Sequence, residues 1–199
     1  MINFDNHNIT GMSYNNHTIK KAYGCDGHLV WEYNPPTPFE GKFKIKYNDG
    51  RVLSGECDTS SVLTSGETQP TGYGVTSMIN AEIGSCVNEI GSKAFDDASN
   101  LVSVNLPEGL IKINSFAFRQ THLTSVVIPE TTTNIASYAF HRCNYLTSVT
   151  VLATTPPALS GTGTAFDNTN ECPIYVPASS VEAYKTTWSR YASRIQPIQ

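Results

Sequence analysis

Three consecutive segments of this chain share one pattern. Each has an Ala-Phe pair, a few polar residues, and then Leu-x-Ser-Val-x followed by an apolar residue. The leucines fall at Leu101, Leu123 and Leu146, so the period is 22 or 23 residues. A unit this short cannot bury its own apolar face, and successive units must stack on a shared core. The sequence therefore predicts a solenoid with a long outer surface. The Ala-Phe pairs are Ala94-Phe95, Ala117-Phe118 and Ala139-Phe140.

Within each repeat the apolar residues have strand spacing. The Leu-x-x-Val-x-Leu pattern places three apolar side chains on the core side, and the residues between them face outward. Ile90, Ile113 and Ile135 recur with the same period and are predicted to form a second wall of the coil. The predicted outward positions form two parallel rows: Ser103, Asn105, Ser125, Val127, Ser148 and Thr150.

Two further segments precede the predicted solenoid of residues 75–199. Residues 1–34 contain a hairpin pattern around the turn Gly24–Gly27, and prolines at 35, 36 and 38 mark a boundary. Residues 35–74 are predicted to be a small β linker domain, with a hairpin whose turn is Asn48-Asp49-Gly50. The Ser, Thr, Gly and Pro content of residues 59–74 predicts a loop that leads into the repeats.

The end of the chain, residues 172–199, is predicted to cap the solenoid. Val181, Tyr184, Trp188 and Tyr191 recur at helical spacing. A helix laid across the last coil would cover the apolar layer exposed there. The predicted fold is mainly β: a short solenoid with parallel strands and a C-terminal capping helix, preceded by a small antiparallel β domain and an N-terminal hairpin arm.

Composition excludes several classes of function. The 199 residues carry a formal net charge of -4 and only 13 Lys and Arg, which do not cluster, so nucleic-acid binding is not expected. No stretch approaches the roughly 20 apolar residues of a membrane span, so no membrane insertion is expected. Residues 1–7 lack the basic and apolar regions of a secretory signal. We therefore expect a protein that stays inside the producing cell until it is released.

The sequence indicates no catalytic residues, no metal site and no cofactor. The five cysteines are odd in number, widely spaced and without a CxxC pair, which predicts buried free thiols. The five histidines share no metal-ligand spacing with a nearby Cys, Asp or Glu. A non-enzymatic role is the main prediction, and a remote enzyme with its site in the loop-rich middle of the chain is a third alternative.

Three stretches resemble the BspA-like (Treponema-type) leucine-rich repeat family over residues 75–199. They are Ile90-Gly91-x-x-Ala94-Phe95, the Leu-x-Ser-Val-x-Ile-Pro strands, and the ending Ile-Tyr-Val-Pro-Ala-Ser-Ser-Val-Glu-Ala-Tyr-Lys. The resemblance implies a leucine-rich repeat solenoid that acts in recognition. Members of this family are largely cell-surface or secreted bacterial proteins, some of them adhesins. This chain has about three and a half clear repeats and no export signal, which departs from the family pattern.

The first segment is similar to N-terminal modules of tailed-phage structural proteins, through Ile19-Lys20-Lys21-Ala22-Tyr23-Gly24-x-Asp26-Gly27-x-Leu29-Val30-Trp31-Glu32. This resemblance implies a virion component (fibre, decoration or tail-associated protein) assembled in the host cytoplasm. Its partners would be other virion proteins or a second copy of the chain, bound through the N-terminal segment. The alternative is a bacterial surface adhesin whose export signal is missing from the sequence. The predicted attachment residues are Ile19, Tyr23, Leu29 and Trp31.

The outward rows are the predicted binding surface for a protein or a host glycan. Arg and Tyr are common anchors of interfaces, and several lie at the corners beside the rows. A polar outer face is also what plain solvated surface looks like, and this alternative stays open. The candidate residues are Ser103, Asn105, Ser125, Val127, Ser148 and Thr150 on the strands, with Arg119, His122, Arg142 and Tyr145 at the corners.

Overall fold

The computed structural model describes residues 22–23, 29–31 and 39–199. The chain divides into two compact units, Met1–Pro38 and Phe39–Gln199. In the first unit, β1 (Ala22–Tyr23) pairs antiparallel with β2 (Leu29–Trp31), as the hairpin pattern predicts. Ile19 lies outside the described residues. Tyr23, Leu29 and Trp31 lie in the two strands, and their role in attachment stays a prediction.

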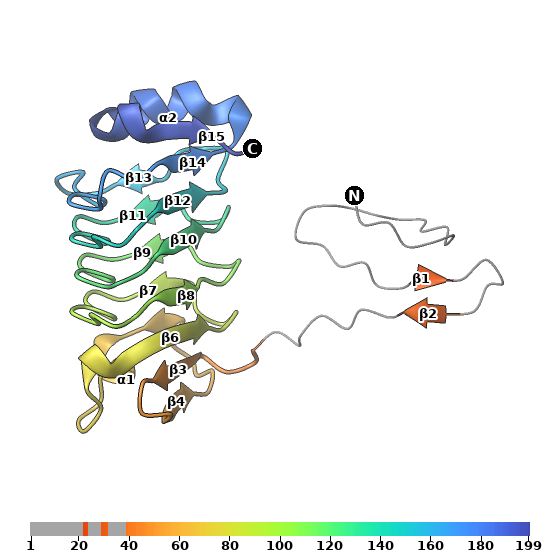
Figure 1. The fold of residues 1–199 in the computed structure, drawn as a ribbon, viewed down its shortest axis with the longest axis vertical. Coiled ribbons are helices and arrows are strands. Elements are labelled where there is room, and N and C mark those ends of the chain that lie inside the picture. Colours follow the sequence, from red (N-terminus) through yellow and green to blue (C-terminus); the bar gives the residue numbers. More distant parts are fainter. Residues whose placement is uncertain (1–21, 24–28, 32–38) are drawn as a thin grey trace. The chain divides into compact units, whose positions relative to one another are not determined.

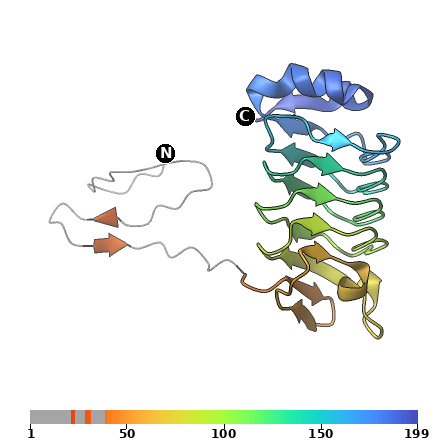
Figure 2. The same cartoon turned by 180° about the vertical axis from the view of Figure 1, so that it is seen from behind.

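The second unit is a solenoid with two strand walls (Figures 1 and 2). In the first wall β6 pairs parallel with β8, and β10, β12, β14 and β15 form one parallel sheet. Thr124 N donates to Val102 O at 3.3 Å and continues the ladder between β8 and β10. The strands of this wall are β6 (Met78–Ile83), β8 (Ser103–Asn105), β10 (Ser125–Ile128), β12 (Ser148–Val151), β14 (Ile174–Val176) and β15 (Ile195–Pro197).

The second wall is a parallel sheet of two-residue strands. Ile90, Ile113 and Ile135 are paired in register and fully buried, which confirms the predicted second wall. Leu101, Leu123 and Leu146 are also fully buried, so the coils share one hydrophobic interior. The strands are β5 (Val62–Leu63), β7 (Glu89–Ile90), β9 (Lys112–Ile113), β11 (Asn134–Ile135) and β13 (Ala158–Leu159).

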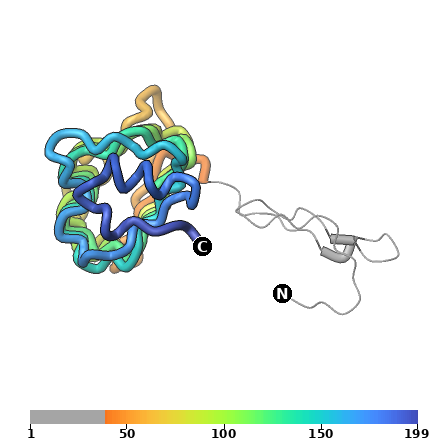
Figure 3. Tube along the Cα trace, turned by 90° about the horizontal axis from the view of Figure 1, so that it is seen from above, coloured from red at the N-terminus to blue at the C-terminus, as the bar shows by residue number. Residues whose placement is uncertain are grey.

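A stack of phenylalanine rings fills the corner between the walls. Phe95, Phe118, Phe140 and Phe166 are fully buried, and neighbouring ring centroids lie 5.1, 5.2 and 5.3 Å apart with nearly parallel planes. Parallel strands lie about 4.8 Å apart, so one ring per coil continues the ladder spacing through the core. Viewed from above, the coils of this unit lie over one another (Figure 3).

The corner backbone is hydrogen-bonded from coil to coil even though it is not strand. Phe118 N donates to Ala139 O at 2.8 Å, and Gln120 N donates to His141 O at 2.9 Å. Residues with a left-handed backbone conformation occur at these corners. They orient every second N–H group, such as those of Phe118 and Gln120, towards the next coil. These residues, with φ between 58° and 62°, are Lys93, Asp97, Phe116, Gln120, Tyr138 and Arg142.

Residues 39–74 belong to the same compact unit as the repeats, whereas the sequence predicted a separate linker domain of residues 35–74. β3 (Phe43–Tyr47) and β4 (Val52–Gly55) form the predicted hairpin, but β3 also pairs antiparallel with β6. Phe43, Ile45 and Tyr47 are buried in the common core. The hairpin thus caps the first coil and shields its apolar layer from water.

The predicted loop of residues 59–74 contains regular structure. β5 pairs with β7, and α1 (Ser65–Thr68) follows it directly. Glu67 accepts hydrogen bonds from the Thr64 amide and hydroxyl groups at 2.8 and 2.7 Å. The Val62-Leu63 pair forms a strand inside this Ser- and Thr-rich segment because it pairs in parallel with Glu89 and Ile90 of the neighbouring coil. A 3-10 helix, η1 (Val75–Ser77), then leads into β6.

The prediction of free thiols is wrong for two cysteines. Cys57 and Cys86 form a disulfide that ties the loop after β4 to the turn after β6. Their separation of 29 residues gave no paired motif to recognise, and the fold alone brings them together. Cys143 and Cys172 are buried free thiols, as predicted, and Cys25 lies outside the described residues.

In the same region a buried lysine pairs with two carboxylates that are partly exposed. The Lys42 ammonium lies 2.6 Å from Glu67 and 3.1 Å from Asp58. Burial alone would lower the pKa of Lys42, but the hydrogen bonds and charges of the two carboxylates outweigh it and the pKa is raised. The lysine, which is the residue before β3, therefore stays charged and links this position to α1.

The C-terminal cap consists of η2 (Ala178–Ser180), α2 (Val181–Thr187) and η3 (Ser189–Arg194). The predicted capping helix is therefore one short α-helix between two 3-10 helices. Tyr184 and Trp188 are buried and donate to Ala153 O at 2.7 Å and Pro157 O at 2.8 Å. Arg194 is buried and donates to the Cys172 and Phe166 carbonyls. The aromatic side chains thus cover the last coil and satisfy its backbone acceptors.

Replacing Phe118 by Ala should destabilise the solenoid by about 3–5 kcal/mol, because the ring is fully buried between two stacked neighbours. Urea unfolding followed by circular dichroism measures this. Val127→Ala, at a position 51% exposed, is the control and should change the free energy of unfolding by less than about 0.5 kcal/mol. Equal effects of the two substitutions would contradict the common core.

Removing the disulfide with Cys57→Ser and Cys86→Ser should lower the free energy of unfolding by roughly 3–4 kcal/mol, the loop-entropy value for a separation of 29 residues. Urea unfolding with and without dithiothreitol provides the comparison. The reductant should destabilise the native chain and leave the double variant unchanged. A native chain indifferent to the reductant would show that the bond does not form.

Candidate binding surface

The outer face of the first wall carries the predicted rows. Ser125 pairs with Ser148, and Val127 pairs with Thr150, in the parallel register of β10 and β12. Towards the N-terminal end of the same wall, Ser103 of β8 pairs with Asn80 of β6. Five of the six predicted row residues are polar, and all six are exposed or half-buried, as expected of an outward row. Val127 is the apolar exception, with 51% of its surface exposed.

The rows extend further than the repeat pattern suggested. β6 and β3 continue the same sheet, so Asn105 is followed by Glu82 and then by Lys44 across the strands. The second row continues from Ser103 to Asn80 and then to Lys46. Sequence analysis missed these positions because it assigned Lys44 and Lys46 to a separate domain. The alternation of apolar residues and lysines in Phe43-Lys44-Ile45-Lys46-Tyr47 was the signal that could have placed both lysines on an exposed sheet face.

His122 and Tyr145 lie next to each other beside the rows. Both residues immediately precede a buried leucine of the repeat, in adjacent coils, and their ring centroids are 4.1 Å apart. Tyr145 is 56% exposed, which makes it the most exposed of the large hydrophobic residues in the described part of the chain. The structure therefore brings these two predicted residues together in an accessible pair.

Arg119 is already occupied by intramolecular partners. Its guanidinium donates to Asp96 at 2.6 and 2.9 Å, approaches Asp97 at 3.3 Å, and lies 5.3 Å from the centre of the Phe116 ring. The hydrogen bond to Asp96 raises the pKa of Arg119. Its charge is thus neutralised within the corner.

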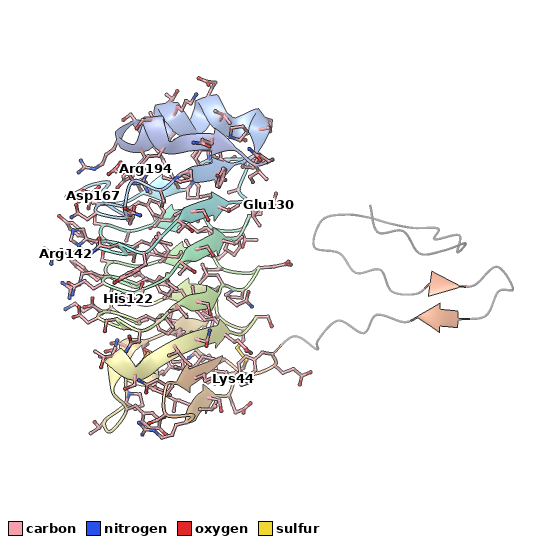
Figure 4. The ribbon with its side chains drawn as sticks, viewed as in Figure 1. Lys44, His122, Glu130, Arg142, Asp167 and Arg194 are labelled. Atoms are coloured by element: carbon pink, nitrogen blue, oxygen red, sulfur yellow. A yellow bond between two sulfur atoms is a disulfide. The ribbon has the colours of Figure 1, made fainter. Side chains whose placement is uncertain are left out.

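Arg142 differs from Arg119. Its side chain is exposed, and it forms no ion pair with a described carboxylate. It projects from the turn side of the coil, and Glu130 lies on the opposite side (Figure 4). Of the two predicted arginines, only Arg142 offers a charge that is free for a partner.

A row of stacked aromatic rings lies along the same corner and was not predicted. Phe116 stacks on Tyr138 at 5.3 Å, and His141 packs edge-on against Tyr138 at 5.1 Å. With Arg119 on Phe116 as well, the ring faces are covered by their own neighbours. Burial and the charge of Arg142 lower the pKa of His141. The row reinforces the corner and offers little free aromatic surface.

A shallow pocket of about 330 Å³ lies at the N-terminal end of the outer face. Strands β3, β4, β6 and β8 contribute its lining, which includes two lysines, two asparagines, a glutamate and a serine. Ser103 and Asn105, predicted from the repeat, are part of it. The polar lining residues are Lys44, Lys46, Asn80, Glu82, Ser103 and Asn105.

The buried Cys143 thiol is a poor nucleophile. Burial raises the pKa of Cys143 to about 11, so the thiol stays protonated at neutral pH. Among the described residues, no group of three His, Cys, Asp or Glu could hold a metal ion. None of the described helices is long and apolar enough to cross a membrane.

The family model for the BspA type leucine rich repeat region matches residues 71–189 in 6 copies. The chain belongs to this family. The six copies exceed the three repeats that the Ala-Phe and Leu-x-Ser-Val patterns show. The resemblance seen in the repeats is thus confirmed, and this family is typically associated with bacterial surfaces.

One solved structure with a similar chain is the leucine-rich repeat protein from Bacteroides ovatus ATCC 8483. It is 16% identical, with a TM-score of 0.33, and the match covers 88% of this chain and 55% of that chain. The present chain therefore corresponds to little more than half of that protein's length. No curated protein matches the chain.

Replacing Arg119 by Ala should lower the free energy of unfolding by about 1–3 kcal/mol, because Asp96, with a side chain only 10% exposed, loses its partner. Arg142→Ala removes an exposed and unpaired arginine, and its effect should stay within about 0.5 kcal/mol. Urea unfolding of the two variants tests the difference. A larger loss for Arg142→Ala would contradict these assignments.

Proposed function

We propose that this protein is a non-enzymatic recognition protein of the bacterial cell surface. It binds a protein or a glycan through the outer face of the first wall. The observation that carries this proposal is the continuous outer face itself, whose polar rows lie beside the accessible His122 and Tyr145 pair. Hydroxyl and amide groups in rows can hydrogen-bond a partner, and an exposed tyrosine is a common interface anchor.

The disulfide supports a location outside the cytoplasm. Disulfides persist in oxidising compartments and at cell surfaces, and cytosolic thiols are kept reduced. The Cys57–Cys86 bond joins the loop after the capping hairpin to the turn after β6, where it has a structural role. Together with the family's usual surface association, it favours the cell surface over assembly in the cytoplasm.

A virion component is the second candidate. The separate N-terminal unit favours it, because the segment that resembles phage structural modules lies in this unit and includes the paired strands β1 and β2. In this version Ile19, Tyr23, Leu29 and Trp31 would attach the chain to other virion proteins or to further copies of itself, and the solenoid would face the host. Protease shaving of intact producer cells separates the two candidates. Release of the solenoid supports the surface protein, and co-sedimentation with phage particles supports the virion protein.

Binding should depend on Tyr145. Native protein immobilised on a surface should retain bacterial or host cells, and Tyr145→Ser should reduce retention at least tenfold, the order expected for an interface anchor. Ile111→Ser on the second wall is the matched control, because Ile111 is 44% exposed and Tyr145 is 56% exposed. An equal loss for both variants, or no loss for Tyr145→Ser, would contradict binding through the first wall.

A further inference from the structure

We propose that the pocket at the N-terminal end of the outer face binds the carboxylate of an acidic sugar at the end of a glycan. This inference rests on the proposed function, because the pocket is part of the same outer face. It adds the class of ligand and assigns the contacts to Lys44, Lys46, Asn80 and Asn105.

The sheet register places the polar groups of the pocket in two short rows. Lys44 pairs with Glu82, and Glu82 pairs with Asn105. In the second row, Lys46 pairs with Asn80, whose amide is hydrogen-bonded to the Ser103 hydroxyl. Directly opposed residues have Cβ atoms about 5 Å apart, so these side chains converge on one small area.

Neither lysine forms an ion pair with a described carboxylate, although Glu82 lies opposite Lys44 in the sheet. Most described Lys and Arg residues are neutralised at 2.6 to 3.6 Å by carboxylates: Lys42, Arg51, Lys112, Arg119, Lys185 and Arg190. Arg194 is buried against backbone carbonyls. Lys44, Lys46, Lys93 and Arg142 are the cations of the described residues that have no such partner. Two of these four line one pocket.

The position of the lysines argues against a purely protective role. Lysines that prevent edge-to-edge pairing of sheets belong on edge strands. β4 is the edge strand of this sheet, but Lys44 and Lys46 lie on the interior strand β3. Glu82 balances one of the two ammonium charges across the strands. One positive charge is left over in a chain whose net charge is -4.

The rest of the lining suits a sugar better than an acidic peptide. The two asparagine amides and the serine hydroxyl can donate and accept, and Glu82 accepts, which matches vicinal hydroxyl groups. Val52, which is 49% exposed and pairs with Lys46, adds apolar surface for the C–H face of a ring. A volume of about 330 Å³ is at the small end of the range for ligand pockets, which fits a terminal sugar.

The test is an NMR titration of the full native chain with 3′-sialyllactose, a hyaluronan tetrasaccharide and neutral lactose. At least one acidic saccharide should shift the amide signals of β3, β6 and β8 and bind at least tenfold more tightly than lactose. Raising the salt from 50 to 500 mM should weaken this binding, because exposed charges are screened.

The double variant Lys44→Gln and Lys46→Gln should lose at least tenfold in affinity, and Lys93→Gln, which removes an unpaired lysine at a corner, should not. Asn105→Asp should also weaken binding, since it adds a repelling carboxylate without changing side-chain size. All these positions are exposed, and unchanged circular dichroism spectra would show that folding is intact.

Equal binding of lactose, absence of shifts in the pocket, or tighter binding of a hexaglutamate peptide than of either acidic saccharide would overturn the proposal. Cell retention is also measured for the Lys44→Gln and Lys46→Gln double variant and for Tyr145→Ser. This comparison distinguishes failure of the saccharide pocket from failure of binding through the outer face. If Tyr145→Ser still abolishes retention when no saccharide binds, only the pocket inference fails.

Discussion

In-register stacking of the coils is the constraint on which the rest of the structure depends. Each coil adds one strand to each wall and one phenylalanine to the buried stack, and all three advance by about the strand spacing of a parallel sheet. The ring separations of 5.1 to 5.3 Å between Phe95 and Phe166 follow from that spacing. A repeat with a different rise would break the ladders and the stack together.

Stacking of this kind requires both ends to be closed. The β3–β4 hairpin closes the first coil, and the Cys57–Cys86 disulfide and the Lys42 ion pairs hold its connections in place. At the other end, Tyr184 and Trp188 cover the last apolar layer and bind its carbonyl groups. Neither cap has a further coil against which to pack. The N-terminal cap is therefore held by a disulfide and ion pairs, and the C-terminal cap by side-chain hydrogen bonds to backbone carbonyls.

The same geometry determines what the outer surface can do. Parallel register repeats a chemical group in a straight row, as in Ser125 and Ser148, and such a row is suited to an extended partner. Most charges are neutralised locally, as Arg119 is by Asp96, so the few free cations stand out. Recognition by this protein therefore depends on a small number of accessible groups on an otherwise self-contained solenoid.

The sequence by itself determined the solenoid, because the period of 22 or 23 residues and the alternation within Leu-x-x-Val-x-Leu are local patterns that only stacking can satisfy. It also determined which residues of the repeats face outward. Tertiary structure alone decided the rest: the Cys57–Cys86 pairing, the fusion of residues 39–74 with the first coil, and the meeting of Lys44 with Asn105. Each of these joins segments far apart in sequence, and such contacts depend on how the chain closes in space, which no local pattern encodes.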